Sequence, residues 1–187
     1  MDAEVHDAGL PPTVDGPRGR PFHLDDGGVV HVRPIQPEDA TALRRFHEGL
    51  SPESQYRRFF SGHPHLSAAE ADHFTRVDHL DREAVLVEDG GRIVGVGRYD
   101  RITAAPVKTA EVAFTVTDDH QHRGIGTLLM SLLTALAADR GFHHLRAVTL
   151  ATNRPMQDLV MGAGRPFQAT FEGGEVDYDL DLDAPMT

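Results

Sequence analysis

The sequence of 187 residues predicts one α/β domain in which a mixed sheet carries helices on both faces. The length suits a single domain with a complete core, and two ordinary domains would need a longer chain. Segments rich in β-branched residues alternate with segments whose apolar residues recur at helical spacing. The predicted order is strand, helices, three strands, helix, strand, helix and two strands, which is typical of a layered α/β fold.

The chain is expected to divide into a poorly ordered tail, residues 1–28, and a folded domain, residues 29–187. The tail contains four prolines and five glycines and shows neither helical nor alternating apolar spacing. Order is expected to begin with a strand over residues 29–35. Pro34 confines that strand to a sheet edge or a strand end, because proline cannot donate a ladder hydrogen bond.

Three helices are predicted after this strand. Pro37, followed by two acidic residues, forms a favourable first turn for the first helix. Ser51 and Pro52 provide an N-cap and a first-turn proline for the second. Ser67 and Glu70 have the capping-box spacing of a third, shorter helix. These helices precede the main series of strands.

In the rest of the chain, segments whose apolar residues alternate with polar ones predict strands, and segments whose apolar residues recur at helical spacing predict helices. Gly90 and Gly91 provide the turn of the first hairpin. The expected elements are a hairpin (84–88 and 93–99), a strand (109–116), a helix (124–140), a strand (144–149), a helix (153–161) and a final hairpin (167–171 and 176–182).

Composition restricts the function. The chain has 18 basic and 29 acidic residues and a formal charge of -11, which disfavours nucleic acid as a partner. The charge favours a cationic acceptor, or it serves only solubility. The absence of cysteine excludes thiolate catalysis and thiolate zinc sites. The longest apolar stretch, 128–138, is too short to span a bilayer, and no secretory signal is recognisable, so no membrane and a cytoplasmic location are expected.

A glycine-containing loop lies between the strand 109–116 and the helix that follows it. Gly124 and Gly126 allow the main chain to approach a ligand closely, and the helix N-terminus favours a phosphate. The alternative is that both glycines only shape a tight turn. The spacing fits neither the dinucleotide-binding fingerprint nor the P-loop.

The loop reads Gln121-x-x-Gly124-x-Gly126, which resembles the signature of the GNAT superfamily of acyl-CoA N-acyltransferases. The resemblance extends from about residue 29 to 182 and implies a three-layer fold, a central mixed, mostly antiparallel sheet flanked by helices, and acetyl-CoA as cofactor. It implies main-chain contacts from Phe114 and Val116 to the pantetheine arm. The pyrophosphate would be bound by Gln121, His122, Arg123, Gly124, Ile125, Gly126 and Thr127.

The same resemblance assigns Asn153, with Met156 on the same helix, to the cofactor site. An N-cap is the alternative role for Asn153. A narrower resemblance, to bacterial protein lysine acetyltransferases that act on acyl-CoA synthetases, is carried by Arg33-Pro34-Ile35-x-Pro37-x-Asp39, Leu50-Ser51-Pro52-Glu53-Ser54, Val77-Asp78-His79-x-x-Arg82 and Ala110-Glu111-Val112-Ala113-Phe114. It implies a protein lysine as acceptor, coenzyme A as product and Glu111 as general base.

The chemistry explains this role of Glu111. A lysine amine, whose ordinary pKa is about 10.4, must lose a proton before it attacks a thioester. Glu111 can accept that proton through a water if partial burial raises its pKa; otherwise it is a glutamate on a half-exposed strand. A main-chain N–H near Val116 is the expected oxyanion donor. His79 is a further candidate for contact with the acceptor, although a loop histidine is more often a surface residue.

Several alternatives remain open from the sequence. Many GNAT relatives have a tyrosine proton donor after Leu159, where this chain has Val160. The missing tyrosine favours a weakly catalytic CoA-binding regulatory module as one alternative. Acetylation of a small amine is a second, because the helical stretch 37–82 expected to form the acceptor pocket does not reveal the acceptor. No metal is expected, because the histidine pairs lack the spacing and carboxylate companions of metal sites. These pairs are His63/His65, His120/His122 and His143/His144.

Overall fold

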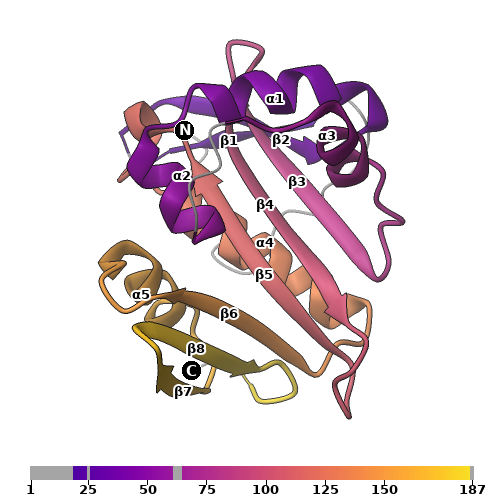
Figure 1. The fold of residues 1–187 in the computed structure, drawn as a ribbon, viewed down its shortest axis with the longest axis vertical. Coiled ribbons are helices and arrows are strands. Elements are labelled where there is room, and N and C mark those ends of the chain that lie inside the picture. The colour runs from indigo at the N-terminus through magenta and orange to yellow at the C-terminus, as the bar shows by residue number, and fades with distance from the viewer. Residues whose placement is uncertain (1–18, 25, 61–64, 186–187) are drawn as a thin grey trace, which may run out of the picture.

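The computed structural model describes residues 19–24, 26–60 and 65–185, which form eight strands and five α-helices (Figure 1). The strands are β1 (Arg20–His23), β2 (Val29–Pro34), β3 (Arg82–Asp89), β4 (Arg92–Ile102), β5 (Thr109–Val116), β6 (His144–Leu150), β7 (Phe167–Glu172) and β8 (Glu175–Asp181). The helices are α1 (Ala40–Glu48), α2 (Pro52–Phe59), α3 (Ala68–Thr75), α4 (Ile125–Asp139) and α5 (Arg154–Met161).

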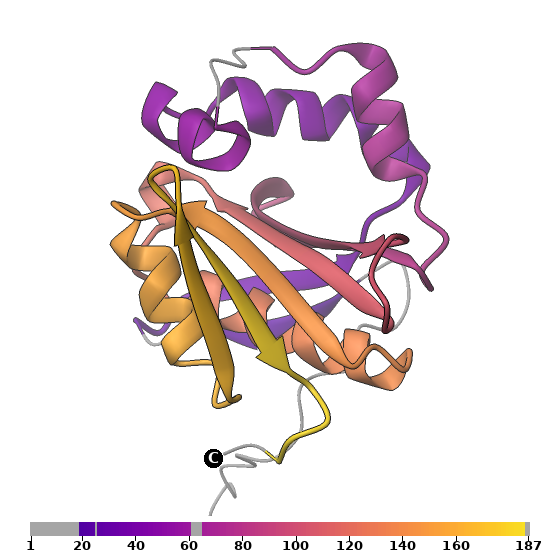
Figure 2. The same cartoon turned by 60° about the horizontal axis from the view of Figure 1, so that its bottom comes forward.

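The strands form one mixed sheet in the order β1-β2-β3-β4-β5-β6-β8-β7. Among the described strands, β5 and β6 are the one parallel pair, and all other neighbours run antiparallel. Helices α1, α2 and α3 cover one face over the N-terminal half of the sheet, whereas α4 and α5 cover the other (Figure 2). The predicted fold class, a mostly antiparallel mixed sheet between helices, is therefore confirmed.

Alternation along the strands separates the core into two layers. On β3, Val85 and Val87 belong to the cluster beneath α4, while Ala84 and Leu86 belong to the cluster beneath α1 and α3. The α1–α3 layer stops short of β6, β8 and β7, so these strands are open to solvent on that face (Figure 1). The acidic residues of β8 lie on this open side, because its apolar residues are buried under α4 and α5.

The N-terminal boundary of the fold differs from the expectation. Arg20–His23, inside the predicted tail, form β1 and pair with residues 29–32 of β2. Leu24, which follows, is buried at 4% exposure. The pairing gives β1 main-chain hydrogen bonds that its own sequence pattern does not reveal. Residues 1–18 lie outside the described part of the chain.

The predicted starts of the second and third helices agree with the structure, whereas Pro37–Asp39, the predicted first turn of the first helix, form a 3-10 turn ahead of α1. Ser51 caps α2 by accepting a hydrogen bond from the Ser54 N–H, and a proline follows it at the first helical position. Ser67 and Glu70 form the reciprocal capping box of α3. These caps satisfy N–H groups that would otherwise have no partner inside the helix.

Helix α4 lies unusually close to β4 because glycines face it. A methyl group added at Gly97 would lie 2.9 Å from Leu133 Cδ1 and 3.1 Å from Leu129 Cδ2, side chains that are fully buried. It would also lie 3.2 Å from Phe114 Cδ1, on β5. Gly97 therefore fixes both the depth of α4 and the position of Phe114.

Gly97→Ala should lower the free energy of unfolding by about 1–3 kcal/mol, because the added methyl overpacks a filled core. Urea denaturation would measure the change. Gly49→Ala is the matched control, since a methyl there would be 3.4 Å or more from its neighbours at an ordinary helical φ. Equal stability of both variants and the native chain would contradict close packing at Gly97.

Candidate active site

The main feature of the sheet is the separation of β5 from β6. The two strands pair at only three positions, the last of which joins Glu111 to Arg146. Beyond this point β5 continues to Val116 and β6 to Leu150 without being paired to each other. A V-shaped gap therefore opens in the centre of the sheet, where unpaired main-chain groups are available to a ligand.

The main-chain groups of Phe114 and Val116 point into this gap. Thr117 N–H donates to Val94 O across the β4–β5 ladder. In an antiparallel ladder the residues that exchange hydrogen bonds alternate with residues that do not, so the N–H and C=O of Val116 and Phe114 face away from β4. Val116 O accordingly accepts a hydrogen bond from Gln121 Nε2 at 3.2 Å.

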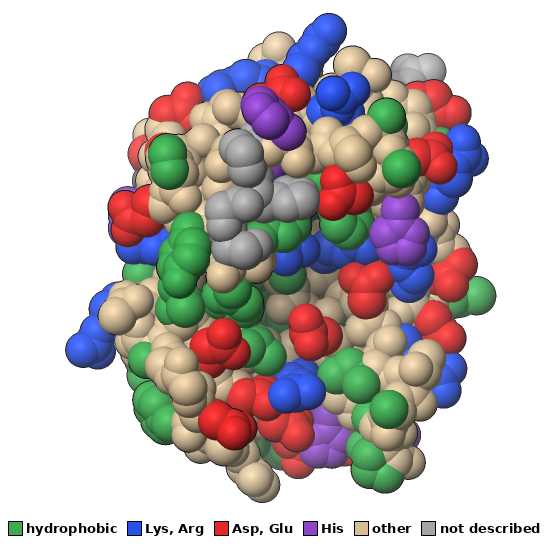
Figure 3. All heavy atoms as spheres, viewed as in Figure 1, with side chains coloured by type: hydrophobic (Ala, Val, Ile, Leu, Met, Phe, Trp, Pro, Cys, Tyr) green, Lys and Arg blue, Asp and Glu red, His purple; other side chains and the backbone are tan. Residues whose placement is uncertain are grey.

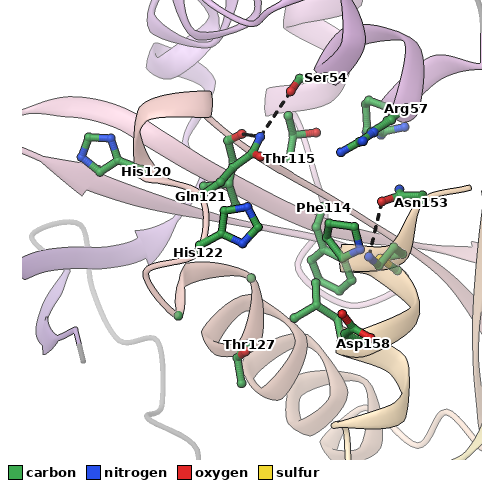
Figure 4. A pocket seen from close by; sticks show the side chains of 17 residues that line it. Ser54, Arg57, Phe114, Thr115, His120, Gln121, His122, Thr127, Asn153 and Asp158 are labelled. Atoms are coloured by element: carbon green, nitrogen blue, oxygen red, sulfur yellow. Dashed lines mark hydrogen bonds between the residues drawn. The ribbon is translucent and has the colours of Figure 1, made fainter. Parts of the chain in front are cut away.

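A cavity of about 320 Å³ lies at this gap, lined by α2, the end of β5, the loop before α4, and the first turns of α4 and α5 (Figure 4). It contains most of the residues predicted to bind the cofactor. These lining residues are Phe114, Val116, Gln121, His122, Gly124, Gly126, Thr127, Asn153 and Met156. The structure thus brings together groups that are up to 42 positions apart in the printed sequence.

The N-terminus of α4 is built to receive an anion. Gly124 is its N-cap residue, with φ 85°, a left-handed conformation that glycine adopts without strain. No side chain of the described residues caps this end of α4, and its first N–H groups are of the kind that bind an anionic ligand. Gly126 is also closely packed, since a methyl group there would lie 3.0 Å from Leu159 Cδ1 on α5.

Two predicted phosphate contacts do not line the cavity. Arg123 forms an ion pair with Asp26, its Nε 2.6 Å from Oδ2, on the loop between β1 and β2. Ile125 is buried at 1% exposure in the core beneath the sheet. Arg123 therefore holds the N-terminal hairpin against the loop, and the side chain of Ile125 anchors α4.

Hydrogen bonds that the sequence did not indicate connect α2 to the loop between β5 and α4. Asp118 accepts hydrogen bonds from Ser51 N–H, Ser51 Oγ and Ser54 Oγ at 2.7–2.9 Å. Gln121 Nε2 adds a bond to Ser54 Oγ at 3.3 Å (Figure 4). Partial desolvation acts to raise the pKa of Asp118, but these hydrogen bonds outweigh it and hold the pKa below its ordinary value.

Asn153 combines the two roles considered for it. Its side-chain oxygen accepts from Met156 N–H at 3.4 Å as the N-cap of α5, and its amide nitrogen donates to Thr149 Oγ1 at 3.0 Å. The residue also lines the cavity (Figure 4). Val160, at the position where tyrosine was considered, is fully buried in the core and does not line the cavity.

Glu111 stands where β5 and β6 part. It pairs with Asp100 of β4 and with Arg146 of β6. Val112 points toward α4, so Glu111 points to the opposite face, which is open beyond the α1–α3 layer. The structure places Glu111 among the exposed residues, whereas partial burial was expected of a base.

His79 lies away from this centre. It adopts a left-handed backbone with φ 57° before β3, and its Nδ1 is 2.7 Å from Glu83 Oε1. It does not line the cavity. His120 does line the cavity, but it lies apart from the other labelled side chains in Figure 4, with its ring nitrogens bonded to Asp119 and Asp89.

The described residues contain no group of three or more potential metal ligands, and none of their helices has the length and apolarity to cross a membrane. His63 lies outside the described residues. His143 and His144 each bond a carboxylate, of Asp183 and Asp179 respectively.

Comparison with known proteins identifies the family. Residues 44–163 match the model of the "Acetyltransferase (GNAT) family". Acetyltransferase PA5475 of Pseudomonas aeruginosa is 34% identical over 145 residues, which cover 75% of this chain and 77% of that protein. The chain therefore belongs to the GNAT acetyltransferase family and is an acyl-CoA-dependent N-acyltransferase.

Other relatives are named as acetyltransferases or acyltransferases. Acetyltransferase Pat of Mycolicibacterium smegmatis is 31% identical over 142 residues, 75% of this chain but only 42% of that longer protein. The GNAT domain of S. lividans PAT superposes with a TM-score of 0.81 and 40% identity, covering 87% of this chain and 96% of that domain. A cAMP-binding acyltransferase from Mycobacterium smegmatis superposes with a TM-score of 0.59 and 27% identity, covering 90% of this chain and 48% of that one.

Asp118→Ala should weaken coenzyme A binding by roughly tenfold, because charge-assisted hydrogen bonds that position the loop are lost. Isothermal titration calorimetry of coenzyme A would measure it, with the surface variant Asp72→Ala as control.

The lowered pKa of Asp118 also predicts a pH dependence. Asp118 stays ionised at neutral pH and loses these contacts only as the pH falls below the ordinary pKa of an aspartate, about 3.9. Unchanged affinity in Asp118→Ala would show that the loop does not need this anchor.

Proposed function

We propose that this protein transfers an acetyl group from acetyl-CoA to the lysine amine of a protein, such as an acyl-CoA synthetase, by direct attack within a ternary complex. The observation that carries the proposal is the position of Glu111 at the point where β5 and β6 separate. Glu111 lines neither cavity, but its side chain faces the open side of the sheet three residues before Phe114, which lines the larger cavity. The relatives named PAT and Pat support the choice of a protein acceptor.

The cavity accounts for binding of the donor in this proposal. The pyrophosphate lies on the N-terminus of α4, at Gly124 and Gly126. The pantetheine arm adds to β5 as a further strand would, through the outward main-chain groups of Phe114 and the C=O of Val116. Met156 and Asn153 close the other wall from α5.

Glu111 then acts as the general base. The protonated lysine reaches it from the open face, a water carries its proton to the carboxylate, and the free amine attacks the thioester carbonyl. Val116 N–H, which points into the gap, stabilises the oxyanion that forms. The attacking nitrogen loses its second proton to water, the amide forms as the carbon–sulfur bond breaks, and coenzyme A leaves as its thiolate. Water protonates the thiolate, since the cavity-lining residues of α5 include no tyrosine.

The open face suits a cationic acceptor. Acidic side chains gather over the lower half of this face, below the hollow that separates it from the helical layer (Figure 3). They include Asp177 and Asp179 of β8, paired with Arg146 and His144 of β6. A lysine-bearing segment approaching Glu111 crosses this field, which raises its local concentration.

Glu111→Gln should lower kcat at neutral pH by about 100-fold, the usual contribution of a positioned base. The loss should shrink as pH rises, because more of the acceptor amine is already deprotonated. Acetyl-CoA affinity should not change, and Glu48→Gln on the exposed surface of α1 is the matched control. Transfer by Glu111→Gln equal to that of the native chain at every pH would refute the assignment.

The acceptor class is tested by incubating labelled acetyl-CoA with an acyl-CoA synthetase and, separately, with a panel of small amines. We expect label on lysines of the synthetase. Label on the amines alone would show that the acceptor is a small amine and would contradict the proposal of a protein acceptor. Binding of coenzyme A without transfer to any acceptor would identify the chain as a CoA-binding regulatory module.

A further inference from the structure

Arg58, near the end of α2, lies between two cavities. It lines the 320 Å³ cavity described above and also a second cavity of about 50 Å³ between the α1–α3 layer and the sheet. Thr115 of β5 lines both as well, so the two spaces adjoin at these residues. The second cavity is mainly apolar, with Phe46, Phe59 and Phe74 in its wall.

The charge of Arg58 has no anionic partner within the described part of the chain. Its guanidinium forms no hydrogen bond or ion pair there, and its one ring contact places Cζ 4.9 Å from the centre of Phe59. Neighbouring arginines differ in this respect, since Arg57 is ion-paired with Glu53 and Arg98 has a carboxylate partner on its own strand. Burial, and then the charge of Arg98, lower the pKa of Arg58 to about 10.

Nearby carboxylates do not neutralise this charge. Asp100 acts on Arg58 only at long range, because its two oxygens accept hydrogen bonds from Arg82 and Arg98. Glu111 also acts only at long range. A partly buried guanidinium without an anionic partner costs free energy, so a ligand that supplies the missing negative charge is bound favourably there.

The position along α2 indicates which anion this is. Ser54 contacts the phosphate-binding loop, and Arg58 follows four residues later, about 6 Å further along the helix axis. Arg58 is thus displaced from the α4 N-terminus toward Ala113 of β5, which lines the second cavity. A planar guanidinium there is suited to the two oxygens of a carboxylate.

We propose that Arg58 binds a carboxylate carried by one of the two reactants, so that the enzyme selects a dicarboxylic acyl donor or a carboxylate-bearing acceptor. The inference rests on the proposed function, because it assigns both reactants to this site. In the donor case, the methylene groups of a short acyl chain enter the apolar second cavity and the distal carboxylate meets Arg58. In the acceptor case, the carboxylate belongs to the molecule that carries the acylated amine, so the acceptor is a free amino acid in place of a protein lysine.

Two matched ligand pairs distinguish these sources, and calorimetry measures each without needing turnover. Succinyl-CoA is compared with acetyl-CoA, and free lysine is compared with cadaverine, its decarboxylated form, in the presence of coenzyme A. We expect the native chain to prefer the carboxylate-bearing member of one pair by about tenfold or more, the usual effect of a charge-assisted hydrogen bond. Arg58→Gln should abolish that preference, while Arg58→Lys should retain only part of it.

The control is Arg76→Gln, which removes one positive charge from an exposed ion pair beyond α3 and should leave all four affinities unchanged. The unliganded Arg58→Gln protein should be at least as stable as the native chain, because an unpaired charge is removed. Preference in neither pair would overturn the proposal, as would an equal loss of affinity for both members of a pair in Arg58→Gln. If no acyl transfer occurs at all, the proposed function fails while these affinities still decide the role of Arg58.

Discussion

The separation of β5 and β6 after three paired residues is the constraint on which the site depends. A continued ladder would satisfy the outward groups of Phe114 and Val116 and leave no space for a pantetheine arm. The gap instead leaves these groups available to a ligand. The N-terminus of α4 lies at its open end, and Glu111 lies at its apex. Donor binding and the proposed base are therefore consequences of the same interruption in the sheet.

The depth of α4 is the second determinant. Gly95 and Gly97 allow the helix to lie against β4 at distances that side chains would prevent. This contact holds the N-terminus of α4, with its available N–H groups, beside the gap. Two fully buried leucines, Leu129 and Leu133, fill the interface. The loop is thus supported by rigid packing, which reduces the ordering cost of binding a flexible cofactor.

Local features of the site were predictable from sequence, whereas long-range ones were not. The strand, loop and helix around Gly124 follow one another in the chain, so spacing and propensity suffice to place them. The hydrogen bond that Ser54 donates to Asp118 joins positions 64 residues apart and depends on how α2 packs on the loop before α4. The sequence shows Arg58 only as one of two adjacent arginines on a helix. Its lack of an anionic partner depends on the residues that the fold places around it. The strand β1 was missed because its pairing partner, β2, stabilises it more than its own composition does.

The hydrogen bonds between Asp118 and α2 connect the loop before α4 with the helix that lines both cavities. Thermodynamic linkage makes such a connection reciprocal: if donor binding orders the loop and with it α2, the acceptor must increase donor affinity by the same factor. A rigid connection of this kind produces cooperativity without a large conformational change, because the entropy lost on ordering α2 is shared between the two ligands. The strength of the coupling between the two substrates is then set by this helix as much as by the cavity it covers.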